Sequence, residues 1–202
     1  MMQRKYRDIS VGLFGGSFNP AHHGHLHVAN AGLKSLALDK IWWLVSPQNP
    51  LKPAQPSYAS RAQTVHDLPL PPNMDVSSVE IDLGTNYTID LIRGLQKRRP
   101  DTRFVFLMGA DNFLQLPKWK DWQEIINRVP IAVIARPGSS VDTTIKTRLG
   151  QAARQYNNYR LPEDQAHILQ FLPAPCWTYL TLPLNSASSS AIRDQHRARV
   201  HD

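Results

Sequence analysis

Short hydrophobic runs alternate with longer amphipathic stretches along the chain. Residues 8–14 contain such a run, and residues 24–38 carry apolar side chains at helical spacing. A second short run, residues 40–45, is rich in aromatic and β-branched side chains, which suits a buried parallel strand. A strand, a helix and a strand at this spacing predict a βαβ unit with a right-handed crossover.

The same alternation continues through the rest of the chain. It predicts further strands at residues 74–78, 103–108, 131–135, 167–172 and 177–182. It predicts helices at 58–68, from about 88 to 99 and at 118–127, another within 143–156, and a short basic helix after a serine-rich turn at 185–190. Ser57 is expected to cap the first of these helices, and Asn86 or Thr88 the second. With no repeat or linker in sight, we expect one α/β domain over residues 1–202, built on a doubly wound and mainly parallel sheet.

A glycine turn joins the first predicted strand to the first predicted helix. It places backbone N–H groups and a helix N-terminus at the carboxyl end of a strand, where both favour an anion. His22 and His25 lie three residues apart, where that anion would bind. The turn therefore predicts a phosphate site, and a nucleotide is the most natural ligand. Its sequence is Gly15-Gly16-Ser17-Phe18-Asn19-Pro20-Ala21-His22-His23-Gly24-His25.

Two further loops leave the carboxyl ends of predicted strands. Residues 46–53 contain three prolines and carry Lys52, the one cation of that loop. Gly109 and Asp111 follow the strand at 103–108. Because ligands of open α/β sheets bind at the carboxyl edge, we expect both loops to surround the ligand. For Asp111, a helix N-cap is the alternative interpretation.

The glycine turn differs from the best-known phosphate motifs. Its glycines do not give G-x-G-x-x-G, and no Gly-Lys-Ser/Thr sequence closes a P-loop. A zinc site is an alternative, because four histidines lie between residues 22 and 27, but the chain has no H-E-x-x-H and no cysteine nearby. We favour phosphate, and we interpret His23 and His27 as surface or helix-face side chains.

Composition limits the class of protein. The 202 residues are 42% hydrophobic, which is enough for a sizeable core. The single cysteine, Cys176, excludes a disulfide within the chain and a cysteine-based zinc site, and it suits a reducing cytoplasm. No hydrophobic run has the length of a membrane span, and the charged N-terminus does not resemble a signal peptide. We therefore expect a cytoplasmic protein without a membrane partner.

The charge balance favours anionic partners. With histidines neutral the net charge is +7, which suits nucleotide phosphates or nucleic acid. The basic residues are scattered, however, and no long Lys/Arg tract with interleaved aromatic residues is present. We therefore do not expect nucleic acid as a partner. A basic nucleic-acid-binding or regulatory α/β domain without catalysis is the alternative from a different class.

Motifs near both ends of the chain resemble those of one superfamily. Residues 15–20 followed by His22-x-Gly24-His25 resemble the nucleotidyltransferase motif G-x-F-D/N-P-x-H/T-x-G-H, and residues 188–193 resemble the second motif, I-S-S-T-x-I-R. Over residues 11–194 the chain resembles bacterial nicotinate-nucleotide adenylyltransferases, which implies a Rossmann-like nucleotidyltransferase fold. The intervening motifs of that family occur in the same order, as Asn49-Pro50-Leu51-Lys52, Tyr87-Thr88, Gly109-Ala110-Asp111, Trp119 and Arg136-Pro137-Gly138.

The resemblance implies a role for each matching residue. His22, His25 and Arg193 would be the catalytic groups and would hold the ATP phosphates. Trp119 would stack on the nicotinate ring, although composition alone equally allows a core tryptophan. The implied ATP-binding residues are Gly15, Gly16, Ser17, Phe18, His22, His25, Gly109, Asp111, Ser189, Ser190 and Arg193. The implied residues for nicotinate mononucleotide (NaMN) are Lys52, Tyr87, Thr88, Trp119 and Arg136.

The reaction implied by the resemblance is transfer of AMP from ATP to NaMN, giving nicotinate adenine dinucleotide and pyrophosphate in NAD biosynthesis. The attacking phosphate oxygen is already ionised, so in-line attack needs neither a general base nor a covalent intermediate. Mg²⁺ is implied as a cofactor carried mainly by the ATP phosphates, with no metal site built from protein residues. Phosphopantetheine and nicotinamide mononucleotide (NMN) are alternative acceptors, and a homo-oligomer is left open.

Overall fold

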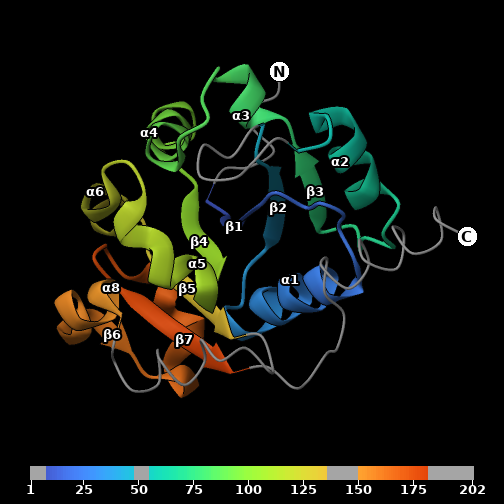
Figure 1. Ribbon diagram of the computed structural model, residues 1–202. Helices are drawn as coiled ribbons and strands as arrows, with labels where there is room; N and C mark the ends of the chain where they lie inside the picture. Colours follow the sequence, from blue (N-terminus) through green and yellow to red (C-terminus); the bar gives the residue numbers. More distant parts are fainter. Residues whose placement is uncertain (1–7, 48–54, 136–149, 182–202) are drawn as a thin grey trace, which may run out of the picture.

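A single parallel sheet forms the centre of the molecule. The computed structural model describes residues 8–47, 55–135 and 150–181. In these ranges the strands pair in the order β3-β2-β1-β4-β5-β7-β6, and every pair is parallel (Figure 1). The predicted doubly wound parallel sheet is therefore confirmed. The strands are β1 (Ser10–Gly16), β2 (Lys40–Val45), β3 (Met74–Ser77), β4 (Arg103–Gly109), β5 (Ile131–Ala135), β6 (Arg160–Leu161) and β7 (Trp177–Thr181).

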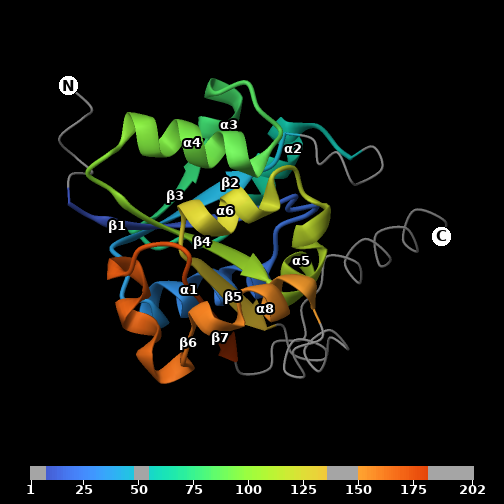
Figure 2. The same ribbon diagram turned by 90° about the vertical axis from the view of Figure 1, so that its left-hand side faces the viewer.

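Helices cover both faces of the sheet, with α1 and α4 on opposite sides in Figure 2. One face is covered by α1 (His23–Ser35), α2 (Tyr58–His66) and the 3₁₀ helix η4 (Glu163–Phe171). The other is covered by α4 (Thr88–Arg98), α5 (Ala110–Gln115), α6 (Trp122–Arg128) and α8 (Gln151–Gln155). The shorter connecting elements are α3 (Val79–Asp82), η2 (Leu116–Lys118) and η3 (Asn157–Tyr159). No described helix has the length and hydrophobicity of a membrane span.

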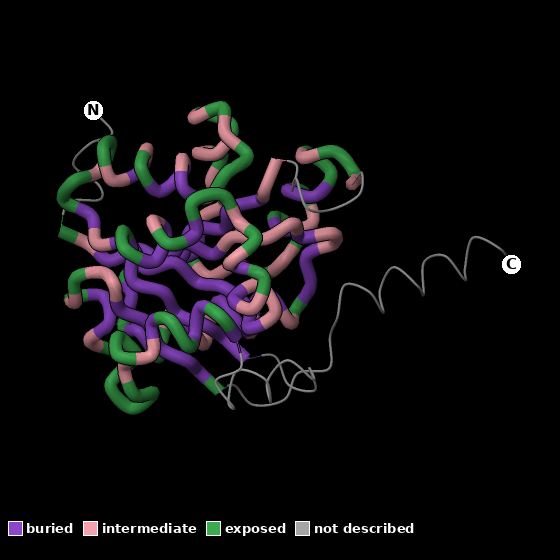
Figure 3. Tube along the Cα trace, turned by 60° about the vertical axis from the view of Figure 1, so that its left-hand side comes forward, coloured by how far each residue is buried: buried purple, intermediate pink, exposed green. Residues whose placement is uncertain are grey.

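Strand β4 shows why the hydrophobic runs become buried strands. Phe104, Phe106 and Met108 pack with the helices of the α4 face, whereas Val105 and Leu107 pack with those of the α1 face. Successive side chains of a strand point to opposite faces, so a strand covered on both sides needs a continuous apolar run. The tube in Figure 3 accordingly shows buried strands at the centre and exposed segments around them.

Strand β4 is the central strand and β1 is its neighbour, and the direction in which strands are added changes between these two. The chain builds β1, β2 and β3 outward on one side, then returns to add β4 beside β1. Phe14 pairs with Leu107, so the strand ends Gly16 and Gly109 lie two residues beyond a matched pair. Ligands of open α/β sheets bind at such a switch point. The fold thus brings the glycine turn and the segment after Gly109 to one crevice.

Most predicted strands are confirmed, with differences of a residue or two at their ends. Ser57 caps α2 as predicted, because its hydroxyl accepts the Ser60 N–H at 3.1 Å. The N-cap of α4 is Tyr87, however, so the expectation that Asn86 or Thr88 caps this helix was wrong. Of the predicted helix at 143–156, the described part contains α8. The predicted basic helix after the serine-rich turn lies outside the described residues.

Two other predictions were wrong in instructive ways. The strand expected at 167–172 is part of η4, which places Leu169 and Gln170 inward. The helix expected at 118–127 begins only at Trp122, because Asp121 adopts a left-handed conformation with φ 48°. Trp119 therefore lies in a loop that follows η2 instead of on a helix.

Candidate active site

His22 is the N-cap of helix α1. Its backbone is extended, with φ −155° and ψ 169°, and its Nδ1 accepts the Gly24 N–H at 3.1 Å. Because Nδ1 is an acceptor, the proton of the neutral ring lies on Nε2. The cap thus fixes both the tautomer and the direction of this imidazole, and Nε2 becomes a hydrogen-bond donor at the helix N-terminus.

His25 lies one turn further along α1, and its ring centroid is 3.9 Å from that of His22. Both side chains are more than nine-tenths buried. The ring of Phe18 packs against the ring of His25, with the two centroids 5.2 Å apart. The first turn of α1 contains no acidic residue, so no carboxylate opposes an anion at this helix end. The two predicted phosphate-binding histidines are therefore brought together in a buried position at the start of α1.

The glycine turn folds around a buried phenylalanine. Phe18 has a φ of 44° and is only 3% exposed, with its ring 5.5 Å from that of Phe14 and 5.1 Å from that of Trp43. A Cβ on Gly16 would lie 2.9 Å from this ring, so a glycine is needed there. The Phe18 side chain belongs to the core, and only its backbone remains as a candidate contact for ATP.

Arg61 of α2 ties the glycine turn to the neighbouring loop. The side chain is 1% exposed, and its guanidinium donates to the Ser17 carbonyl (2.7 Å), the Pro47 carbonyl (2.6 Å) and the Pro56 carbonyl (2.9 Å). Pro47 and Pro56 lie on either side of residues 48–54. Arg61 was not predicted as a site residue, because an arginine in an amphipathic helix is normally exposed.

A pocket opens beside the glycine turn, on the α4 face of the sheet. It encloses about 910 Å³ of space, part of it open to solvent. The Trp119 ring forms one wall and meets Phe106 edge-on, with ring centroids 6.4 Å apart. Six residues predicted for ATP or NaMN meet around this pocket, which confirms that the fold brings them together: Gly15, Gly16, Ser17, Tyr87, Thr88 and Trp119.

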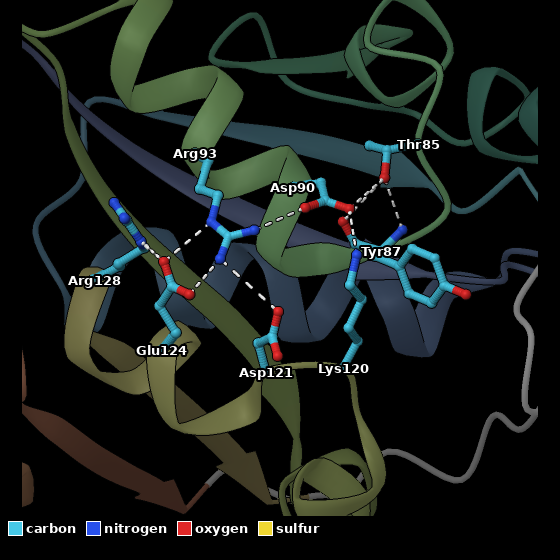
Figure 4. Close-up of polar contacts among 8 residues, drawn as sticks. All are labelled: Thr85, Tyr87, Asp90, Arg93, Lys120, Asp121, Glu124 and Arg128. Carbon is cyan, nitrogen blue, oxygen red and sulfur yellow. Dashed lines mark hydrogen bonds and ion pairs between the residues drawn. The ribbon is translucent and has the colours of Figure 1, made fainter.

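Ion pairs hold two walls of the pocket together, as Figure 4 shows. Arg93 of α4 pairs with Glu124 of α6 through two hydrogen bonds. Lys120, beside Trp119, pairs with Asp90 at 3.2 Å, and its Nζ lies 4.6 Å from the centre of the Tyr87 ring. The start of α4 is thus linked to the loop that carries Trp119.

Glu124 is the common acceptor of this network. Hydrogen bonds from Arg93 and Arg128 lower the pKa of the Glu124 carboxyl to about 2. The group therefore stays ionised throughout the neutral range, and the link between α4 and α6 does not depend on pH there.

The segment after β4 carries the other predicted adenosine-side residues. Gly109 ends the strand and is the N-cap of α5, while Asp111 lies in the first turn of that helix. The alternative interpretation of Asp111 as an N-cap was therefore wrong. Binding of adenosine by its carboxylate stays a prediction. The predicted residues Lys52, Arg136, Ser189, Ser190 and Arg193 lie outside the described residues.

Several pocket residues were missed by the sequence analysis. Asn86, Asn112, Lys118 and Lys120 line the pocket, and so does Glu80 of α3. Burial raises the pKa of the Glu80 carboxyl to about 7, and the nearby Arg61 opposes this rise. The two lysines flank Trp119 in the sequence, which was the available signal. Glu80 gave no comparable signal, because an isolated glutamate is usually a surface residue.

The donor groups of the site suit phosphate. In the ranges that the structure describes, no three histidine, cysteine, aspartate or glutamate side chains come together as metal ligands. His22 and His25 thus have no third ligand of these types in those ranges. Imidazole N–H and helix N–H groups are hydrogen-bond donors for phosphate oxygens.

Sequence comparison identifies close relatives over nearly the whole chain. The profile of the cytidylyltransferase-like family matches residues 13–195. A probable nicotinate-nucleotide adenylyltransferase of Parvibaculum lavamentivorans is 46% identical, over 93% of this chain and 92% of the relative. Another protein of that description, from Caulobacter sp. K31, is 48% identical over 92% of this chain and 97% of its own length.

A solved structure agrees with this assignment at the level of the fold. The Plasmodium falciparum nicotinic acid mononucleotide adenylyltransferase complexed with APC has a TM-score of 0.66 at 16% identity, over 92% of this chain and 83% of that protein. At this identity the likeness supports the fold alone. The identities above, over more than nine-tenths of the sequence, support more. This chain belongs to the cytidylyltransferase-like family and, within it, to the nicotinate-nucleotide adenylyltransferases, which are nucleotidyltransferase enzymes of NAD biosynthesis.

Proposed function

We propose that this chain transfers AMP from ATP to NaMN, forming nicotinate adenine dinucleotide and pyrophosphate, at the crevice between β1 and β4. One observation carries the assignment to this site. Gly15, Gly16 and Ser17 line the pocket of Trp119 and also lead into the helix start that holds the histidine pair. A phosphate site and an acceptor pocket therefore share one wall, as direct transfer between two bound substrates requires.

The histidine pair acts on the ATP side. The NaMN phosphate oxygen attacks the α-phosphorus of ATP in line, and pyrophosphate leaves without a covalent intermediate. His22 donates from Nε2, the nitrogen left as donor by the cap to Gly24. The His25 ring lies against that of His22, so a second imidazole stabilises the charge that develops on the phosphates. Fixed donors of this kind stabilise a transition state without reorganising.

The acceptor pocket suits an aromatic ring that carries a carboxylate. Trp119 offers its ring for stacking, and Thr88 begins α4 at the pocket wall, where the helix dipole favours an anion. Lys118 and Lys120 add positive charge on the same side. These groups favour nicotinate over nicotinamide, because the amide carries no charge to pair with them.

The remaining roles rest on the family resemblance. Gly109 and Asp111 hold the adenosine, while Ser189, Ser190 and Arg193 hold the outer phosphates of ATP. Lys52 and Arg136 contribute positive charge around NaMN. An arginine fork is suited to phosphate oxygens, since it donates two parallel hydrogen bonds.

Mg²⁺ enters this proposal bound to ATP. The groups proposed to hold the phosphates are imidazole and N–H donors, which are poor ligands for Mg²⁺, so the ion would be carried mainly by the ATP phosphates. When bound, the cation neutralises charge on the triphosphate. The chain contributes His22 and His25 to the same phosphates. We further place the enzyme in the cytoplasm, where a lone buried thiol such as Cys176 stays reduced.

The decisive experiment compares acceptors. Pyrophosphate release is measured with ATP and Mg²⁺ in the presence of NaMN, NMN or phosphopantetheine. We expect the highest kcat/KM with NaMN and the next highest with NMN. Turnover with phosphopantetheine but not with NaMN would contradict the proposal, and equal kcat/KM with NaMN and NMN would remove the role given to the lysines and the α4 helix end.

A further inference from the structure

Glu80 is a half-buried acid in the wall of the acceptor pocket, and the proposed transfer of AMP does not use it. Its Oε2 atom is inaccessible to solvent and has no hydrogen-bond partner in the part of the chain that the structure describes. α3, which carries Glu80, packs against β2, whereas Trp119 packs against Phe106 of β4. The elements that carry Glu80 and Trp119 therefore lie on opposite sides of β1, and we name these two sides of the pocket the Glu80 end and the Trp119 end.

Charged neighbours give Glu80 no direct partner of its own. Arg61 is close enough to affect its ionisation, but the hydrogen bonds of that guanidinium go to three backbone carbonyls. Tyr58 is the other ionisable group of α2 near Glu80. A buried carboxylate oxygen without a donor is destabilising. Glu80 also lines the pocket, so a ligand in the pocket meets this residue from the cavity side.

The two ends of the pocket differ in charge. Lys118 and Lys120 lie at the Trp119 end, and the Glu80 carboxyl lies at the other. NaMN carries a carboxylate on its ring, hydroxyl groups on its ribose and a phosphate at the far end of the ribose. The ring carboxylate suits the lysine end. A phosphate does not suit the Glu80 end, because like charges repel, whereas a ribose hydroxyl can donate to a carboxylate.

We infer that Glu80 accepts a hydrogen bond from a ribose hydroxyl of the acceptor mononucleotide. This inference rests on the proposed function and adds a binding residue to it. The contact orients the sugar between the stacked ring and the glycine turn, so that the phosphate at its far end points toward ATP. Glu80 thereby binds the acceptor substrate but takes no part in the transfer of AMP.

The test combines a change in the protein with a change in the substrate. NaMN and its 2′-deoxyribose and 3′-deoxyribose analogues are compared with wild type, Glu80→Ala and Glu80→Gln. We expect Glu80→Ala to raise the KM for NaMN tenfold or more and to leave the KM for ATP unchanged. Glu80→Gln, which keeps an acceptor oxygen, should recover part of that loss. With the analogue that lacks the contacted hydroxyl, wild type and Glu80→Ala should differ less than twofold.

Asp75→Asn provides a matched control. Asp75 is a carboxylate on β3 that pairs with Lys40 at 2.9 Å and does not line the pocket, so its loss should leave both KM values unchanged. An equal loss with NaMN and both analogues, or a rise in the KM for ATP as well, would overturn the inference while wild-type turnover of NaMN upholds the proposed function. No wild-type turnover of NaMN would overturn the proposed function and this inference together.

Discussion

At the scale of the residue, the two nitrogens of the His22 ring have one observed role and one proposed role. Nδ1 caps α1 through Gly24, and the proposed function assigns Nε2 as a donor to the ATP phosphates. A histidine at an N-cap is unusual, because serine, threonine, aspartate and asparagine are the preferred capping residues. The two roles can therefore be separated by substitution.

We predict that His22→Asn loses catalysis and keeps the cap. Asparagine is among the best N-caps, so the free energy of unfolding should change by less than about 0.5 kcal/mol. The ring donor is lost, so kcat for pyrophosphate release should fall by about 10²–10³-fold. Steady-state kinetics and denaturant titration measure the two quantities separately.

His23→Asn serves as the control for this substitution. His23 is exposed and begins the same helix, so both kcat and stability should stay near the wild-type values. A wild-type kcat in His22→Asn would show that the His22 ring has no part in the transfer.

Glu80 gives a prediction for stability against pH. Its pKa is about 7 in the folded protein, against 4.5 for a free side chain. Between these two pH values the folded state holds a proton that the unfolded state has released. The stabilisation that this proton gives to the folded state is complete below about pH 4.5 and is lost as pH rises through 7. Relative to Glu80→Gln, the wild type should lose about 1–3 kcal/mol between pH 5 and 8.

Thermal unfolding of wild type and Glu80→Gln at pH 5 and pH 8 checks this sign. The difference in Tm between the two proteins should change in favour of the variant as pH rises. Asp75→Asn should show no such change relative to wild type. A constant difference between wild type and Glu80→Gln would mean that Glu80 titrates like an exposed carboxyl.

At the scale of the element, α4 and α6 act as two linked walls of the acceptor pocket. Arg93 reaches from one helix to Glu124 on the other, and Asp90 holds Lys120 next to Trp119 (Figure 4). Surface ion pairs of this kind add little to stability. Their effect should instead be on the position of Trp119 relative to the start of α4.

We predict that Arg93→Gln weakens acceptor binding more than it weakens the fold. The KM for NaMN should rise about three- to tenfold, because small displacements of a positioning wall affect binding strongly. The free energy of unfolding should fall by less than about 1 kcal/mol. Arg98→Gln, an exposed position at the end of the same helix, is the control. A loss of stability without any rise in KM would contradict the positioning role.

Element type was predictable where the apolar pattern was long or tightly bounded. The pattern at 167–172 was neither, and short apolar runs of this kind do not distinguish a strand from a buried helical turn. In the structure, the two-residue strand β6 pairs with β7 at the edge of the sheet instead. The start of α6 depends on the left-handed backbone conformation of Asp121. The pattern of apolar residues carries no information about the conformation of one residue.

At the scale of the whole molecule, one amide joins the two ends of the described chain. Gln170 of η4 is buried, and its Nε2 donates to the Leu36 carbonyl (3.0 Å) and the Ala37 carbonyl (2.6 Å) at the end of α1. Leu36 is the C-cap of α1 and Ala37 follows it, so Gln170 supplies donors for two carbonyls at the point where the chain leaves the helix.

We predict that Gln170→Ala lowers the free energy of unfolding by about 1–3 kcal/mol, because two carbonyls lose their buried donor. Activity at 25 °C should stay within twofold of wild type, since α1 meets the active site at its other end. Denaturant titration and pyrophosphate release measure these effects. Gln165→Ala, at an exposed position of the same 3₁₀ helix, should be neutral. Equal stability of both variants would contradict the bridging role.

The sequence was sufficient for the topology and for one half of the site. The local pattern of a hydrophobic strand followed by a glycine turn is enough to predict that His22 and His25 follow the carboxyl end of a strand. Lys118, Glu80 and Arg61 could not be found in this way, because their roles arise from segments far apart in the chain. Trp119 lies between these cases: the family motif identified it, and only the packing against Phe106 places its ring in the pocket wall.

The three hydrogen bonds of Arg61 also have a consequence for folding kinetics. Its acceptors belong to residues 17, 47 and 56, so the guanidinium finds them only after the exits of two strands and the start of α2 have come together. We therefore predict that these contacts form after the folding transition state. Arg61→Lys should therefore unfold markedly faster while refolding at nearly the wild-type rate. On this view the lifetime of the assembled active site is set by an arginine that contacts no substrate.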